Sequence, residues 1–139
     1  MIETGIANET SWTVAPDHLA SAFGSGLVDA LATPVLVGFC EECARTMVDP
    51  QLPIGRKTVG MSIRLDHLAP TPLGMRVTVA AELVEIDRRR LRFEIEARDE
   101  VEIVGRATHE RFIVDADRFD ERIREKLATV DASPEDREI

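Results

Sequence analysis

The distribution of hydrophobic residues along the chain follows two periods. Between Ala32 and Met47 the apolar residues recur every three or four positions, which is the spacing of one face of an α-helix. Thr33 can cap the free N–H groups at the start of this helix, and Pro34 suits its first turn. The helix is expected to end near Pro50. The pattern therefore predicts one long helix that is apolar on most of its surface.

After this helix, apolar and polar residues alternate one by one, which is the period of a β-strand. In residues 58–69 the odd positions from Val59 through Met61 to His67 share one face, and the even positions from Ser62 to Asp66 share the other. The same alternation predicts three more strands, which run from Val77 to a turn at 87–90, from Leu91 to a turn at 99–100, and over 101–114.

The order of these elements predicts the fold class. A short strand at residues 11–15, a loop or short helix after it, and a final amphipathic helix with Phe119 and Ile123 complete the pattern. One long helix that covers an antiparallel meander is an α+β architecture. The 139 residues suit a single domain, for which we expect an N-terminal extension at 1–9, a folded domain at 10–128 and a disordered tail at 129–139.

The long helix has a second face that one sheet cannot cover. Opposite its main apolar stripe lie Val37, Glu41, Ala44 and Val48. A second subunit is the expected cover, which predicts a homodimer or a higher oligomer and places Glu41 in an interface. Glu42 lies about 100° away on the helix and is expected to face solvent.

Composition excludes several classes of function. Acidic residues outnumber Lys and Arg by 26 to 17, and a formal charge of −9 repels nucleic acid and anionic lipid. The first ten residues contain no apolar signal segment, and no stretch approaches the ~20 apolar residues of a membrane helix. We expect a cytoplasmic protein that binds neither nucleic acid nor membranes.

The cysteines and histidines give little support for a metal site. Cys40 and Cys43 are three residues apart, but His18, His67 and His109 lie in separate predicted elements. No second close-spaced ligand pair completes a structural zinc site, so core packing is the favoured interpretation of both thiols. The position of His67 at the end of its strand is, by itself, that of a residue hydrogen-bonded to the following turn.

Long segments of the chain resemble a known family, the hot-dog-fold acyl-CoA thioesterases, and most of all the fluoroacetyl-CoA thioesterases. The resemblance spans roughly residues 10 to 125 and is carried by LATPVLVGFCEECA, by TVGMSIRLDHLAPTPLGMRVTVAAELVEIDRRRLRFEIEARDE and by GRATHERFIV. In this family a Thr precedes a Glu by eight residues and a His follows the Glu by 26. The matching residues here are Thr33, Glu41 and His67, and Gly60 matches an active-site glycine.

The resemblance implies a hot-dog fold and thioester hydrolysis without a cofactor, since coenzyme A enters as part of the substrate. Glu41 is expected to act as nucleophile or general base, and His67 to hold or move the proton. Gly60 could donate its N–H to the oxyanion or let the substrate approach the backbone, and Thr33 could orient substrate or water.

Coenzyme A carries phosphates that need local cations on this acidic chain. The candidates are Arg88, Arg89 and Arg90 at the predicted turn, together with Arg56 and Lys57. A solvated turn explains the three adjacent arginines equally well.

One further matching stretch receives no role at this stage. His109, Glu110 and Arg111 also match the family, but alternation puts them on opposite faces of a strand, and no catalytic role is assigned to them.

Two other functions remain open at this stage. A hot-dog acyl-CoA hydratase or dehydratase would act on an enoyl or β-hydroxyacyl chain, and a non-catalytic acyl-CoA binding module would keep the pocket without turnover. Within the thioesterases, residues 24–32 contain no aromatic side chain where the fluoroacetyl-CoA enzyme closes its pocket with one. A broader or different short acyl chain is therefore equally compatible with the sequence.

Overall fold

The computed structural model describes residues 2–130 of the chain. In order, its strands and helices are β1 (Ala7–Thr13), η1 (Pro16–His18), α1 (Ala20–Phe23), α2 (Thr33–Val48), η2 (Asp49–Gln51), β2 (Arg56–His67), β3 (Arg76–Asp87), β4 (Arg90–Arg98), β5 (Ile103–Asp115) and α3 (Ala116–Ala128). The elements predicted from the two hydrophobic periods are all present. The first strand begins at Ala7, so residues 7–9 of the expected extension belong to the sheet.

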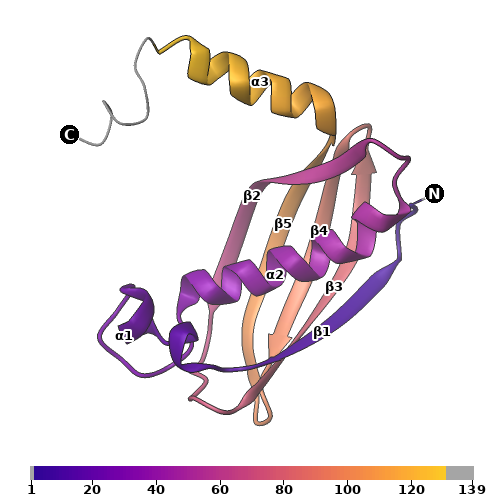
Figure 1. Cartoon of the computed structure of the whole chain (residues 1–139). Coiled ribbons are helices and arrows are strands. Elements are labelled where there is room, and N and C mark those ends of the chain that lie inside the picture. The colour runs from indigo at the N-terminus through magenta and orange to yellow at the C-terminus, as the bar shows by residue number, and fades with distance from the viewer. Residues whose placement is uncertain (1, 131–139) are drawn as a thin grey trace.

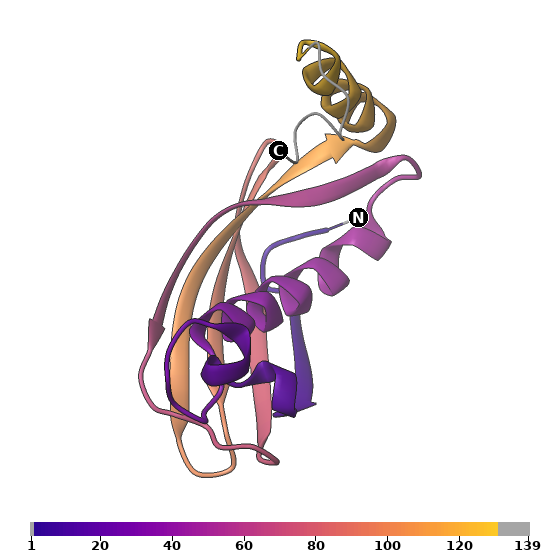
Figure 2. The same cartoon turned by 60° about the vertical axis from the view of Figure 1, so that its left-hand side comes forward.

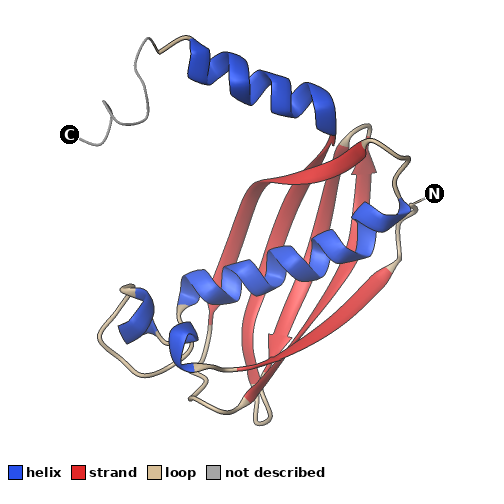
Figure 3. Cartoon of the chain, viewed as in Figure 1, coloured by secondary structure: helices blue, strands red, loops and turns tan. Residues whose placement is uncertain are grey.

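The five strands form one antiparallel sheet in the order β1-β3-β4-β5-β2. The sheet curls around α2, which crosses its concave face (Figure 1 and Figure 2). Figure 3 shows that the other helices lie at the ends of the sheet rather than on this face. The arrangement is the predicted α+β architecture, with β1 and β2 as the two edge strands.

The core lies between α2 and the concave face of the sheet. Its helix residues are Leu36, Phe39, Cys40, Cys43, Ala44, Met47 and Val48. Trp12 of β1 stacks on Phe39 with ring centroids 4.3 Å apart, which covers one flank of the helix. Each large apolar side chain buried here contributes about 1.5–3 kcal/mol, so this stripe fixes where α2 sits on the sheet.

The sheet covers more of the second face of α2 than the sequence suggests. Ala44 and Val48 are fully buried within the chain itself, and only Val37 and Glu41 remain half-buried. The expectation that Ala44 and Val48 need a partner subunit is wrong, because the curled sheet wraps farther around the helix than a flat sheet would. The part of this face without cover is thus confined to the middle of the helix.

Strand β2 contains a β-bulge that the sequence pattern does not reveal. Gly60 pairs with Arg111 but Ser62 pairs with Glu110, so Met61 is an extra residue. The bulge reverses the alternation, and the side of the sheet that faces α2 carries Thr58, Gly60 and Ile63. The predicted position of Val59 and Met61 on the core face is therefore wrong, and Met61 is 53% exposed.

The last helix of the described residues lies outside the core. The final helix α3 matches the predicted amphipathic helix, yet it extends away from the end of β5 and has no buried residue. Residues 131–139 of the expected tail lie outside the described residues. Within residues 2–130 no helix combines the length and the hydrophobicity needed to cross a membrane.

Candidate active site

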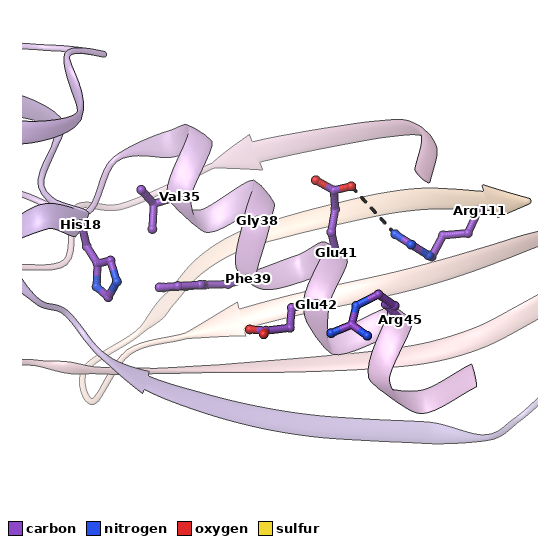
Figure 4. A pocket seen from close by; sticks show the side chains of 8 residues that line it. All are labelled: His18, Val35, Gly38, Phe39, Glu41, Glu42, Arg45 and Arg111. Atoms are coloured by element: carbon purple, nitrogen blue, oxygen red, sulfur yellow. Dashed lines mark ion pairs between the residues drawn. The ribbon is translucent and has the colours of Figure 1, made fainter. Parts of the chain in front are cut away.

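Glu41 lies in the middle of α2, on the part of the helix that the sheet leaves open. Its side chain is 42% exposed, and Oε2 lies 3.8 Å from Nη1 of Arg111 on β5. Figure 4 shows that Glu41 and Glu42 point to different sides of the helix. Glu42 is exposed, as its helical position predicts. Of the two acids, only Glu41 is held by a buried cation.

Gly60 lies directly under the carboxylate of Glu41. A Cβ atom at this position would lie 2.8 Å from Oε2 of Glu41, a distance that real Cβ atoms do not tolerate. The bulge in β2 follows directly after Gly60, and the missing side chain lets the carboxylate rest against the backbone. A side chain at this position would displace the carboxylate.

Arg111 is held in place by Thr58 of the neighbouring strand β2. Its side chain is 6% exposed, its Nε donates to Thr58 Oγ1 at 2.8 Å, and its Nη2 donates to the Thr58 carbonyl at 3.2 Å. The Thr58 hydroxyl donates in turn to Asp49 at 2.6 Å. Burial lowers the pKa of Arg111, while Asp49 and Glu41 oppose this effect. The guanidinium stays charged under all ordinary conditions because its usual pKa is so high.

His109 completes the buried group beneath Glu41. Its Nδ1 lies 2.8 Å from the carbonyl oxygen of Ser62, and its Nε2 lies 3.2 Å from Nη1 of Arg111. Burial lowers the pKa of His109, and the charge of Arg111 lowers it further, although the Ser62 carbonyl opposes the shift. The site therefore contains a neutral imidazole next to a buried guanidinium.

Thr33 and His67 form a second polar pair at the start of α2. Thr33 Oγ1 lies 2.7 Å from His67 Nδ1, and burial lowers the pKa of this histidine. The capping position of the helix is Ala32, and no side chain caps it. The expectation that Thr33 caps the helix is wrong, because its hydroxyl contacts His67 instead.

These two groups are separate within one chain. Thr33 and Glu41 are eight residues apart on α2, which is about 12 Å along the helix axis. Glu41 lines an open hollow of about 530 Å³, whereas Thr33 and His67 line another of about 340 Å³. The structure thus brings Glu41 to Gly60 and Thr33 to His67, but it does not bring His67 to Glu41.

Three of the five cations predicted for the coenzyme A phosphates already pair with carboxylates. Arg90 pairs with Glu85, Asp87 and Glu110, and is occupied by these carboxylates. Arg56 and Arg89 both contact Asp115, at 3.3 and 3.9 Å.

Arg56 also lines an apolar hollow of about 430 Å³ together with Arg88, which occupies the turn between β3 and β4 with a positive φ of 59°. Neither Arg88 nor Lys57 forms an ion pair with any residue between 2 and 130. Arg88 and Lys57 are therefore the two predicted cations without a carboxylate partner among the described residues.

The sequence interpretation missed Arg111 and His109. Alternation places both on the same face of β5 as the buried Ala107 and Ile113, with only Glu110 on the other side. Because His109 and Arg111 occupy odd positions like these buried residues, the sequence could have indicated a buried cation and a buried imidazole that face α2. His18 was also missed as a site residue, although it lines the hollow beside Glu41 and stands edge-on to Phe39.

Both cysteines are free and buried, and burial raises the pKa of Cys40 to about 12. This agrees with the predicted packing role. Among the described residues, no three His, Cys, Asp or Glu side chains gather in a way that could hold a metal ion.

Comparison with known proteins places this geometry in a family. Residues 14–117 match the family model described as fluoroacetyl-CoA-specific thioesterase. The chain belongs to this family. The fluoroacetyl-CoA thioesterase of Streptantibioticus cattleyicolor is 38% identical over 99 residues, which make up 70% of this chain and 70% of that protein.

The fold agrees with this assignment. The solved structure of the fluoroacetyl-CoA thioesterase FlK superposes with a TM-score of 0.86 at 29% identity, covering 91% of this chain and 98% of that one. A thioesterase superfamily member of Thermus thermophilus has a TM-score of 0.84 at 24% identity, with 94% and 98% coverage, which supports the fold alone. A hot-dog-like protein of Thermanaerovibrio acidaminovorans, at 23% identity with 88% and 91% coverage, has a TM-score of 0.83. The predicted hot-dog fold is confirmed.

Proposed function

We propose that this protein hydrolyses a short-chain acyl-CoA thioester to the free acid and coenzyme A, with Glu41 as nucleophile or general base. Membership of the thioesterase family supports the reaction class. The observation that carries the assignment to Glu41 is its position, half exposed at an open hollow, against the backbone of Gly60 and beside Arg111. A carboxylate held in this way is directed at whatever enters the hollow.

The chemistry needs three groups. Attack on the thioester carbonyl forms a C–O bond, either from Glu41 itself or from a water that Glu41 deprotonates. The C–S bond then breaks, and the thiolate of coenzyme A leaves and takes up a proton. When Glu41 is the nucleophile, water then hydrolyses the acyl–Glu41 anhydride, which releases the free acid and regenerates the carboxylate. The Gly60 N–H is the proposed donor to the oxyanion, and the Thr33–His67 pair is the proposed group for orientation and proton transfer.

A homodimer would unite the two separate groups. β2 is an edge strand of twelve residues, so one row of its backbone N–H and C=O groups is available for pairing with another strand. An antiparallel pair of β2 strands centred between Ile63 and Arg64 would set Gly60 opposite the partner's His67. Glu41 would then share a site with the Thr33–His67 pair of the other chain, which explains why one chain keeps them apart.

The remaining assignments concern the rest of the substrate and the location. We assign the coenzyme A phosphates to Arg88 and Lys57, which form no ion pair with any residue between 2 and 130, and to Arg56, which has one carboxylate partner and lines a hollow with Arg88. Arg90 is less available, since it pairs with three carboxylates. A cytoplasmic location is in keeping with two free cysteines, which are typical of a reducing compartment. The acyl group is short, and fluoroacetyl is one candidate because the relative from Streptantibioticus cattleyicolor carries that name.

The test of this function is Glu41→Gln, assayed on a panel that includes acetyl-, fluoroacetyl-, butyryl- and crotonyl-CoA. Gln keeps the shape and removes the charge, so kcat should fall by roughly a thousandfold while the far-UV spectrum and melting temperature stay unchanged. Glu42→Gln is the matched control on the adjacent helix position and should hydrolyse at the wild-type rate. Turnover by Glu41→Gln within about threefold of wild type would remove Glu41 from the mechanism. Hydration of crotonyl-CoA without hydrolysis would replace the thioesterase by a hydratase.

A further inference from the structure

His109 is a buried titratable group to which the proposed mechanism gives no task. It is 1% exposed and lies in the middle of β5, facing α2. Each of its ring nitrogens lies within hydrogen-bonding distance of a group that can either only donate or only accept. These two partners determine which ring nitrogen carries a proton, whatever reaction the protein catalyses.

The Nδ1 atom must carry the proton. Its partner at 2.8 Å is the carbonyl oxygen of Ser62, which can only accept. The partner of Nε2 at 3.2 Å is Nη1 of Arg111, which can only donate. A charged imidazole would set an N–H against an N–H at this point. The geometry therefore requires a neutral ring, protonated on Nδ1 and bare on Nε2.

Within the part of the chain that the structure describes, the lone pair on His109 Nε2 accepts a hydrogen bond from Nη1 of Arg111 and so holds this arm of the guanidinium. The Nε and Nη2 atoms of the guanidinium are directed to Thr58, at 2.8 and 3.2 Å. Nη1 is the nitrogen that lies between His109 and Glu41, 3.8 Å from the carboxylate. The imidazole thus holds the arm of Arg111 that faces Glu41.

The other nitrogen of the same ring holds the bulge. Ser62 follows the extra residue Met61, so the Nδ1–H bond to its carbonyl fixes one side of the bulge in β2. The ring also lies close to Gly60, where an added Cβ would be 3.6 Å from its Cε1. One imidazole therefore connects the backbone under Glu41 with the cation beside it.

We infer that His109 is a positioning residue for thioester hydrolysis, which in its neutral Nδ1–H form holds Arg111 toward Glu41 and fixes the bulge at Gly60. The inference rests on the proposed role of Glu41. The charged groups that face this pair are Glu41 and Arg45 of α2 and Asp49 of η2, while Glu110 points to the outer face of β5.

The first test needs no turnover. Protein labelled with 15N-histidine should show, at pH 7, a neutral ring with a protonated Nδ1 and a bare Nε2 that is missing from the spectrum of His109→Gln, which assigns that ring to His109. The opposite tautomer, or a charged ring at pH 7, would overturn the inference whatever the enzyme hydrolyses. Because this result does not depend on Glu41, it separates failure of the inference from failure of the proposed function.

The second test compares two substitutions on the best acyl-CoA of the panel. His109→Leu removes the acceptor, and we expect kcat to fall roughly 30-fold or more with KM changed less than about threefold, since a small misplacement of catalytic groups is costly. His109→Gln restores an acceptor and should return kcat to within about fivefold of wild type.

Thr108→Val, on the outer face of the same strand, is the matched control and should match wild type in kcat and KM. Wild-type kcat in His109→Leu, or an equal loss of kcat in the Leu and Gln variants, would show that the ring only fills space. If the Leu variant does not fold, the Gln variant decides: kcat within about fivefold supports the inference, and a loss beyond about 30-fold overturns it.

Discussion

At the scale of single residues, Gly60 is where the fold and the candidate site constrain each other most closely. Gly60→Ala would place a Cβ 2.8 Å from Oε2 of Glu41. That oxygen is the end of a flexible, half-exposed side chain, so the carboxylate should move aside while the fold survives. We expect kcat to fall about 10- to 100-fold with a nearly unchanged melting temperature. An Ala variant with wild-type kcat would mean that Glu41 does not act from this position.

The residues of the site differ in how far the sequence could predict them. Thr33, Glu41 and His67 stand at spacings that match the family, and Gly60 falls within a matching segment. The contact between Glu41 and Arg111 joins residues seventy positions apart, and no local pattern records such a contact. His109 and Arg111 were within reach, because counting alternate positions along β5 puts both on the buried face.

At the scale of secondary-structure elements, α2 carries a glycine that tests whether its open face is covered. Gly38 lies in mid-helix, and a Cβ added there meets nothing within 4 Å. Gly38→Ala should therefore raise the free energy of unfolding by about 0.5–1 kcal/mol, measured by urea denaturation, because Ala restricts the unfolded chain and favours the helix. A fall of similar size would indicate that another chain packs closely against this glycine.

The elements themselves were predictable because each has one buried face. The helical period of α2 and the alternation in β3, β4 and β5 follow directly from burial against a common core. The bulge in β2 was not predictable, since Met61 continues a regular alternation in the sequence although the structure leaves it outside the ladder. A register shift depends on the partner strand, which a single segment does not specify.

At the scale of the whole molecule, the half-buried His67 and the buried His109 make stability depend on pH. Burial lowers the pKa of His67 and of His109, whereas in the unfolded chain both should titrate near 6.5. Below about pH 6.5 the unfolded chain therefore binds protons that the folded chain refuses, and the free energy of unfolding falls as the pH falls. Each histidine contributes up to about 1.4 kcal/mol per pH unit in this range.

Urea midpoints measured from pH 5 to pH 8 should rise with pH and level off above about pH 7.5. His109→Gln removes one of the two groups and should reduce the slope between pH 5 and pH 6.5. A flat profile in wild type would contradict the lowered pKa of the two histidines in the folded protein.

The proposed dimer makes a prediction about mixed chains. A Thr33→Ala chain still supplies Glu41, and a Glu41→Gln chain still supplies Thr33 and His67, so a heterodimer of the two would contain one intact site. Random exchange makes half of the dimers mixed, and the mixture should recover about a quarter of the wild-type rate per chain. If mass spectrometry confirms exchange and the mixture remains as inactive as each parent, the site is complete within one chain.

The extra residue Met61 in β2 could be gained or lost in the gene without a change in the rest of the fold. On either side of Met61 the residues already alternate as in a regular strand, with Gly60 facing α2, Ser62 facing outward and Ile63 facing α2 again. Deleting Met61 would therefore keep every remaining side chain of β2 on its present face and leave the core intact. It would also straighten the backbone opposite Glu41. The difference between a plain edge strand and one bent toward the carboxylate is a single in-frame codon, a change that one insertion can make without first disturbing the fold.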